Sequence, residues 1–388
     1  MGQYRVYLLG WTGEKITQLF PGDDFLSLTW EHRRNQPGTY RLELVGETGT
    51  KDRFLKHYAI SIERNWGNAP GDWYEEYTGF HLGKQEWWVN PDDGPDEHYW
   101  ASLGLSPEWL VDQPLLQPVA NQGNNAWAYY DTWAQHGYSD DIIKAMVGES
   151  MVSPADTDRD YTSMALQGDT GEAVWSCYDG SWIRLQDAIT DTIGETGDLG
   201  GCDFRVTRVS GGYEFRTYTP FYGTDRRRGN SAGNKPTIFS FENGNMRNPD
   251  HRELWAEQVT VAYGGGGGEG MQRPIEYRQN DAALAESPFS RREGFYDMRD
   301  VQIPDRIPGI LDQHLIDDGL QTFVTAGILQ TDACLYGRDW NFGDLVTLDL
   351  PGSRTYDMRI VEVGGGIDGE NEERIEGVIE LWTREEVA

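Results

Sequence analysis

The sequence consists mainly of short apolar runs of about four to eight residues between turn-forming residues, which is the spacing of β-strands. Residues 40–45 alternate apolar and polar side chains, as a strand with one buried face does. Residues 25–30 and 58–62 form two similar runs, and the turn sequence Asn-Gln-Pro-Gly at 35–38 follows the first of them. The N-terminal part is therefore predicted to be a β-meander.

Two segments in the middle of the chain follow a helical period instead. Residues 140–147 place apolar side chains on one face, and residues 181–193 repeat them at helical spacing. Ser181 is a candidate cap for the second helix, which is expected to stop at Gly194. Residues 87–133 are rich in Trp, Pro, Asp and Asn and have no clear period, which indicates a long irregular connection or an inserted subdomain.

The pattern then returns to strands. Residues 204–209 and 213–218 flank a Ser-Gly-Gly turn and predict a hairpin. A strand at 259–263 precedes five glycines at 264–268, which are expected to be too flexible for regular structure and to mark a domain boundary. The last strands are expected at residues 345–350, 358–363 and 375–381. The sequence thus predicts a mainly β protein that contains some helices.

The composition indicates a folded chain of several modules. Its 388 residues exceed the usual domain of about 100 to 200 residues, so two to four modules are expected. The 15 Trp, 20 Tyr and 13 Phe argue against disorder. The formal charge is -31, from 64 acidic and 33 basic residues, and phosphate binding requires a basic surface. Sequence-specific nucleic-acid binding is therefore not expected.

Export and membrane insertion are not expected either. The N-terminus lacks the charged segment and apolar stretch of a signal peptide. No run of about 18 apolar residues predicts a membrane span. Cys177, Cys202 and Cys334 are widely spaced and form no CxxC pair, so reduced thiols in a cytoplasm are expected.

No catalytic, cofactor-binding or metal site is expected. Residues 229–233 match the GxSxG pattern of a nucleophile elbow, but the pattern around Ser231 predicts neither the strand before it nor the helix after it. A polar loop is predicted there instead. The seven histidines are scattered and show no metal-ligand spacing; they are His32, His57, His81, His98, His136, His251 and His314.

Two other candidate sites leave alternatives open. Asp156, Asp158 and Asp160 have the spacing of a calcium loop, but Tyr161 stands where glycine is required, which excludes an EF-hand and leaves a weaker cation site possible in principle. Tryptophans crowd residues 66–100, where exposed indoles would stack on sugars and buried indoles would fill a core or a subunit interface. Burial, much of it between subunits, is the favoured interpretation.

The order of these segments carries a resemblance to a known family. It comprises residues 26–30, 37–44, 60–64 and 77–80, then the helix at 181–193, the hairpin at 204–218, and residues 223–226, 238–240, 243–246, 258–261, 273, 290–295 and 342–346. In this order they resemble the tail hub, or baseplate hub, family of long-tailed siphovirus-like phages.

The resemblance implies a mainly β (α+β) fold of tail-tube-like β-barrel domains with an inserted helical and irregular domain, forming a ring. The implied domains are an N-terminal tube-like barrel at 1–105, an inserted mixed helical domain at 106–200, a hairpin-rich domain at 201–265 and a C-terminal tube-like barrel at 266–388. Two barrels in each chain of a homotrimer would give a pseudo-six-fold surface that continues a hexameric tail tube.

The implied function is that of a structural virion protein at the tail tip and not of an enzyme. It would be assembled in the host cytoplasm, close or extend the tail tube, and let DNA pass through its ring. The expected partners are the tail tube or distal tail protein ring, the tape measure protein, and tail fibre or receptor-binding proteins. A channel for DNA should have an acidic or neutral wall, for which Glu372 and Glu373 are candidates. The alternative is that the acidic residues solvate the outer surface.

A carbohydrate-binding or carbohydrate-cleaving β protein is the alternative, because the chain is rich in tryptophan and in acidic residues. The host, the receptor, the open or plugged state of the ring and the role of residues 87–133 are left open by the sequence.

Overall fold

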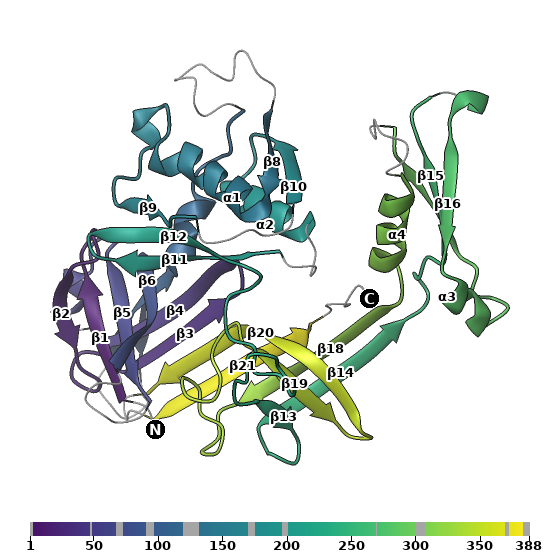
Figure 1. Cartoon of the computed structure of the whole chain (residues 1–388). Helices are drawn as coiled ribbons and strands as arrows, with labels where there is room; N and C mark the ends of the chain where they lie inside the picture. Colours follow the sequence, from purple (N-terminus) through teal and green to yellow (C-terminus); the bar gives the residue numbers. More distant parts are fainter. Residues whose placement is uncertain are drawn as a thin grey trace. The chain divides into compact units, whose positions relative to one another are not determined.

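The computed structural model describes residues 3–46, 49–66, 73–90, 97–118, 132–169, 175–195, 201–268, 270–299, 307–368 and 372–382. The chain divides into two compact units, of which the first comprises Met1–Asn248 with Ala326–Ala388 and the second Pro249–Thr325 (Figure 1). The glycine run at 264–268 lies inside the second unit. The division into four domains stays a prediction.

One large, mainly antiparallel sheet dominates the first unit. Its strands follow the order β14-β18-β21-β20-β3-β4-β7-β6-β5-β1-β2, with β19 and β13 attached to β20. Their bounds are β1 Gln3–Leu9, β2 Lys15–Leu19, β3 Ser27–Arg33, β4 Gln36–Val45, β5 Ala59–Asn65, β6 Trp73–Val89, β7 Glu97–Leu105, β13 Ile238–Ser240, β14 Met246–Leu254, β18 Gln321–Leu329, β19 Leu345–Leu350, β20 Arg354–Ile367 and β21 Glu373–Leu381. N-terminal strands and C-terminal strands are therefore hydrogen-bonded within one sheet, where β3 pairs with β20.

The sheet is not a simple meander. The hairpin β3–β4 forms around the predicted turn at 35–38, but β4 also pairs with β7. The strands β1 and β2, which were not predicted, pair with each other, and β1 also pairs with β5. The prediction of an irregular segment from residue 87 is wrong up to Leu105, because Trp87 and Trp88 lie in β6 and Trp100 lies in β7. The pattern hides β6 because its first half pairs with β5 and its second half with β7, across a bulge between His81 and Gly83. Residues 91–96 and 119–131 lie outside the described residues.

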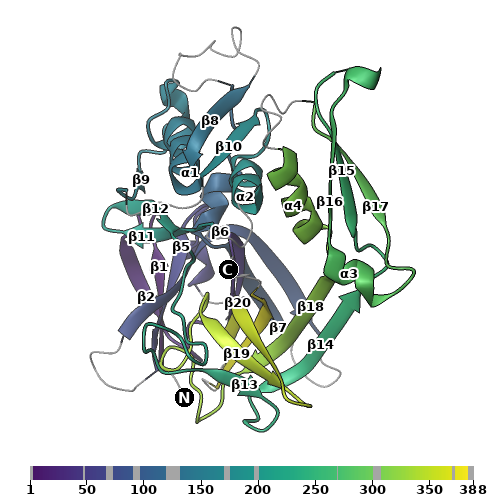
Figure 2. The same ribbon diagram turned by 45° about the vertical axis from the view of Figure 1, so that its right-hand side comes forward.

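The inserted helices lie in the first unit and share one core with the N-terminal strands. The helices are α1 Ser139–Val147 and α2 Leu185–Glu195, accompanied by β8 Trp133–Tyr138, β9 Met164–Leu166 and β10 Trp175–Gly180. The predicted hairpin is β11 Asp203–Val209 with β12 Gly212–Tyr218, and it lies between these helices and the N-terminal strands (Figures 1 and 2). Phe80, Ile142, Ile189 and Phe215 are buried together in this core. The two helices and the hairpin form as predicted. The predicted bounds of the second helix are wrong, because α2 begins at Leu185, which leaves Ser181 outside the capping position, and it continues through Gly194 to Glu195.

The second unit is a small α/β arrangement. Its strands β15 Val261–Gly265, β16 Ile275–Gln279 and β17 Glu293–Asp297 pair in the order β16-β15-β17, and its helices are α3 Asp281–Glu286 and α4 Ile307–Asp317. Gly264 and Gly265 lie in β15, so the expectation of a wholly flexible glycine run is wrong. A Cβ atom on Gly264 would lie 3.0 Å from Ile307 of α4. Glycine is thus used to let the helix approach the strand.

The mainly β fold with inserted helices is confirmed, and the three predicted C-terminal strands correspond to β19, β20 and β21. Within the described residues the large sheet follows an open order and does not close into a barrel. No described helix is both long and apolar enough to cross a membrane.

Candidate functional site

The feature with the most functional meaning is an uncovered face of the large sheet. Side chains along β3, β4, β21 and the second half of β20, from Glu362 onward, alternate between buried and accessible positions. Leu28, Trp30, Leu42 and Ile379 point into the core. The register brings the accessible side chains of the four strands to the other side, which we call the open face: Ser27, Thr29, Glu31, Arg33, Thr39, Arg41, Glu43, Glu362, Gly364, Gly366, Arg374, Glu376 and Val378.

Glycine shapes the middle of the open face into a trough of about 590 Å³. Gly364 and Gly366 lie on the open face and leave the backbone of β20 uncovered there, whereas Gly365 faces Trp30. A Cβ atom at Gly365 would lie 2.3 Å from the Trp30 ring. The glycines therefore serve the packing of Trp30 on one side and a hollow on the other.

The trough is acidic. Its lining contains five carboxylates and two guanidinium groups, namely Glu31, Glu362, Asp368, Glu372 and Glu376 with Arg247 and Arg374. Burial and the neighbouring Glu31 carboxylate raise the pKa of Glu362. Both effects oppose ionisation of Glu362, because burial removes water from the carboxylate and Glu31 adds a second negative charge nearby. The wall of the trough would repel phosphate.

The two acidic residues singled out in the sequence have different positions. Glu372 lines the trough, so its proposed place in a channel stays a prediction. Glu373 does not, because its side chain is only 1% exposed and its Oε1 lies 2.6 Å from Nε of Arg64, which is equally buried. Burial favours the neutral acid, but the hydrogen bond from Arg64 and its charge lower the pKa of Glu373 to about 2. The prediction that Glu373 faces a channel is wrong.

Glu373 ends a chain of buried polar contacts that we call the buried relay. Tyr4 donates to Glu373 over 2.6 Å, and Arg64 also donates to the carbonyl of Tyr336 over 2.8 Å. Tyr336 in turn donates to Oε1 of Glu76 over 2.8 Å. The relay therefore connects β1, β5 and β6 to the segment before β19 and to β21, which lie at opposite ends of the sequence.

The relay continues through His32 to the hairpin. Nε2 of His32 lies 2.9 Å from the carbonyl of Glu76, and its Nδ1 lies 3.3 Å from Nη2 of Arg205 on β11. Because a guanidinium can only donate, Nδ1 accepts from Arg205 and Nε2 donates to the carbonyl of Glu76. Arg205 is paired with Glu108 at 2.8 Å. Burial opposes ionisation of Glu76 and Glu108, but their hydrogen-bond donors and nearby positive groups lower both pKa values.

A cavity of about 340 Å³ borders the relay. His32, Glu76, Arg205 and Tyr336 line it, and all of them belong to the first unit. The charged groups around it are already bonded to one another, as expected of a relay that fixes the relative positions of its strands.

The residues considered for catalysis and metal binding do not assemble a site within the described parts of the chain. Ser231 is exposed in the loop between β12 and β13, with no helix after it, as predicted. Asp156 caps the short 3-10 helix Thr157–Arg159 by accepting from the backbone of Asp158, and Asp160 follows that turn. His32 and His81 are buried side chains with polar partners, Glu76 and Ser102 respectively.

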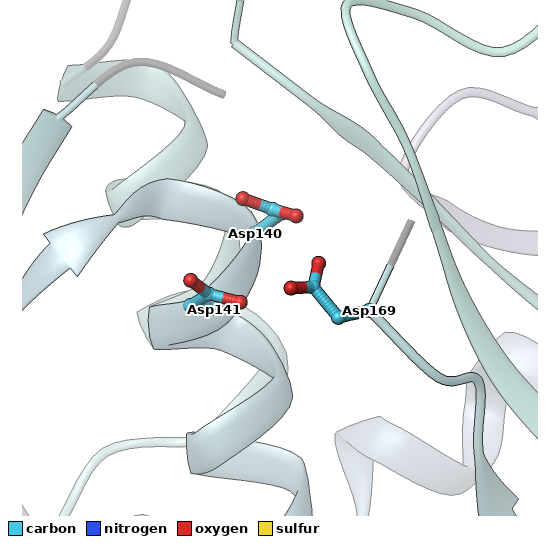
Figure 3. Close-up of side chains that lie close together, drawn as sticks. All are labelled: Asp140, Asp141 and Asp169. Carbon is cyan, nitrogen blue, oxygen red and sulfur yellow. The ribbon is translucent and has the colours of Figure 1, made fainter. Parts of the chain in front are cut away.

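Three other carboxylates do come together. Asp140 and Asp141 in the first turn of α1 and Asp169 each offer an oxygen within 4.8 Å of the others (Figure 3). Lys144 lies 3.8 Å from Asp140 and supplies one positive charge beside them. Sequence reasoning missed this cluster, because Asp169 is remote in the sequence and follows no ligand spacing.

Some tryptophans of residues 66–100 are buried, as a core or interface role predicts, and others are exposed, as a sugar-binding role predicts. Trp100 is buried at 3% exposure, as favoured, whereas Trp88 is 65% exposed and stacks on His98 with ring centroids 4.8 Å apart. Trp87 stacks on Tyr99 in the same hairpin. Cross-strand stacking of this kind stabilises the β6–β7 hairpin, so the exposed rings have a structural role that does not require a bound sugar.

Comparison with known proteins shows the family to which the chain belongs. The family described as Siphovirus ReqiPepy6 Gp37-like protein matches residues 14–379. The chain belongs to this family of siphovirus tail proteins. The resemblance to the tail hub family is thereby confirmed, and the chain is a structural component of a phage tail and of the virion. No curated protein matches the sequence.

Solved tail proteins share the fold of this siphovirus tail protein. The tail protein from Neisseria meningitidis MC58 has a TM-score of 0.53 at 10% identity, with 98% of each chain covered. The prophage MuSo2 43 kDa tail protein from Shewanella oneidensis has a TM-score of 0.55, also at 10% identity with 98% of each chain covered. The prophage tail protein gp18 from Listeria monocytogenes EGD-e has a TM-score of 0.51 at 10% identity and covers 97% of this chain and 94% of that one.

Proposed function

We propose that this tail protein is the tail-tip hub, a homotrimeric ring that closes or extends the tail tube and lets DNA pass. The observation that carries the proposal is the open face, which runs continuously from N-terminal to C-terminal strands and is polar, acidic in its trough and uncovered in the chain described here. Its partners would be the tail tube or distal tail ring, the tape measure protein and receptor-binding proteins. The role is structural, and no enzymatic activity is proposed.

The edges of the sheet support a ring. Among the described strands, β14 pairs only with β18, and the second half of β6 pairs only with β7. A head-to-tail arrangement of copies in which these edges meet would continue the sheet from one chain to the next. Cyclic symmetry closes such heterologous contacts into a ring. Each chain contributes its N-terminal strands and its C-terminal strands, so three copies would present six sets of strands to a six-fold tube.

We expect the purified chain to be a trimer, with a mass three times the 44.0 kDa of one chain. Multi-angle light scattering over a range of protein concentrations measures this directly. A stable monomer, or a hexamer of this chain alone, would contradict the proposed ring.

The acidic trough has a testable consequence for DNA ejection. If the open face lines the channel, the double substitution Glu362→Lys and Glu372→Lys places cations where phosphates pass, and virions should eject DNA several-fold more slowly at low salt, with recovery at high salt. Asp52→Lys is the matched control, because Asp52 is exposed in the short helix Lys51–Arg53 and outside the open face. Ejection followed by dye fluorescence should be unchanged in the control, and equal rates for both variants would remove the channel assignment.

A further inference from the structure

Among the described residues, the three-stranded sheet of the second unit has one face packed against α4 and one face on which most side chains are exposed. Residues paired across its strands share a face, so Ala262 and Gly264 of β15 lie on the same side as Tyr296 of β17. This side packs against α4, where Ala262, Met298, Ile307 and Leu311 form the buried core. The residues that alternate with these along each strand form the other side, which α4 does not cover.

Aromatic side chains line this uncovered side. Tyr263 is paired with Tyr277 of β16 on one side and with Phe295 of β17 on the other, which makes a row across the sheet. Ile275 lies beside them on the same face. Tyr277, Phe295 and Ile275 are 56%, 58% and 54% exposed. We call these four side chains the aromatic face.

The second unit is poor in buried apolar surface. Its core cluster contains four buried residues, whereas the aromatic face leaves three large side chains more than half exposed. Contiguous exposed apolar surface of this kind marks an interaction site in a soluble protein. A three-stranded sheet with one small helix gains stability when its second face is also covered.

Paired arginines border the aromatic face. The guanidinium of Arg273 lies over the Phe295 ring, 5.4 Å from its centroid, and is ion-paired with Asp297. Arg291 donates to Oη of Tyr263 over 3.1 Å and is paired with Glu293 at 2.7 Å. Arg273 covers part of the Phe295 ring, which disfavours stacking of a sugar there. Tyrosine, phenylalanine and arginine together are the composition of protein–protein hot spots.

We propose that the aromatic face docks a second copy of this chain within the ring. The proposal rests on the proposed function. The chain carries a formal charge of -31, so two copies repel one another over most of their surfaces. On the aromatic face each arginine has an acidic partner, and the local charge is balanced. This is a surface on which two copies can meet with little repulsion.

The size of the face also favours a ring contact. Each strand has five residues, so the face measures about 17 Å by 10 Å, well below the roughly 800 Å² that each partner of a stable complex buries. It is too small to hold a separate protein by itself. As one part of a larger contact between neighbouring copies, it supplies a desolvated aromatic centre.

The test is the double substitution Tyr277→Ser and Phe295→Ser. Both side chains are exposed, so circular dichroism and the melting temperature of the monomer should be preserved, while the concentration at which half of the chain is trimeric should rise at least ten-fold. Phe289→Ser is the control: Phe289 is 92% exposed, lies outside the aromatic face, and its loss should leave assembly unchanged. If the double variant loses its fold, Tyr277→Arg provides the same comparison with one change.

The outcomes separate this inference from the hub proposal. A wild-type monomer in light scattering contradicts both. If the wild type is a trimer and the double variant forms trimers with the same concentration dependence, the hub proposal stands but the aromatic contact is overturned. A double variant that stays trimeric but loses binding to another tail component also overturns it, because that component and not a second copy then covers the face.

Discussion

Replacement of Arg64 by Met is expected to lower the free energy of unfolding by about 3 to 5 kcal/mol, because it leaves a buried carboxylate without its cation. The side chains of Arg64 and Glu373 are each 1% exposed. Arg64 also donates to the carbonyl of Tyr336 and to Oε1 of Gln330. The substitution thus removes contacts between N-terminal strands and C-terminal segments as well as a charge pair.

The matched control is Arg247→Met. Arg247 pairs with Glu376, which lies three residues beyond Glu373 on the same strand β21, but both of these side chains are 47% exposed. Exposed pairs contribute less than about 1 kcal/mol. Urea denaturation at pH 7 measures both variants. Equal losses for Arg64→Met and Arg247→Met would show that burial of the first pair has no energetic consequence.

The Arg64–Glu373 pair also determines how the free energy of unfolding changes at acidic pH. The pKa of Glu373 is about 2, below the value of about 4.3 for an unfolded Glu, so its contribution is fully present above that unfolded value and is lost as the pH falls toward 2. The lowered pKa values of Glu76, Glu108 and Asp203 act in the same direction. The difference between wild type and Arg64→Met should therefore shrink between pH 5 and about pH 2.

Local features of the fold could be predicted from the sequence, and long-range pairing could not. Alternation in residues 40–45 and helical spacing in residues 181–193 depend on the segment alone, and both elements form, although the helix begins only at Leu185. The partner of each strand depends on tertiary contacts, and β3 meets β20 more than 300 residues away in the chain. Family resemblance supplied the tail assignment that the local pattern by itself could not.

The candidate site also depends on long-range pairing that the sequence pattern does not reveal. The acidic turn before the last strand predicted that Glu372 and Glu373 face a channel, which requires accessible side chains. Glu372 meets this requirement, because it lines the trough. For Glu373 it fails, because the next side chain along a strand points to the opposite face and there meets Arg64, a residue of β5. Only the strand register distinguishes the two neighbours, and the register is set by β20 and β21 together.

The glycines of the sheet lead to the second large effect, for Gly104→Ala. Gly104 lies in β7 opposite His81 of β6 and Tyr40 of β4. A Cβ atom there would lie 1.8 Å from the backbone oxygen of Phe80 and 2.4 Å from the Tyr40 ring. The oxygen belongs to the backbone next to the bulge where β6 changes partners, so it cannot move without disturbing the ladder.

We expect Gly104→Ala to lower the free energy of unfolding by about 3 kcal/mol or more, at the upper end of what overpacking costs, or to prevent folding. Gly83→Ala is the control on the neighbouring strand, because the nearest atom to its Cβ would be 3.9 Å away, and it should change stability by less than about 1 kcal/mol. Urea denaturation, or the soluble yield if the first variant does not fold, compares the two. Similar stability of both variants would mean that β7 can shift away from Phe80, and the bend that separates the two halves of β6 would then not depend on glycine.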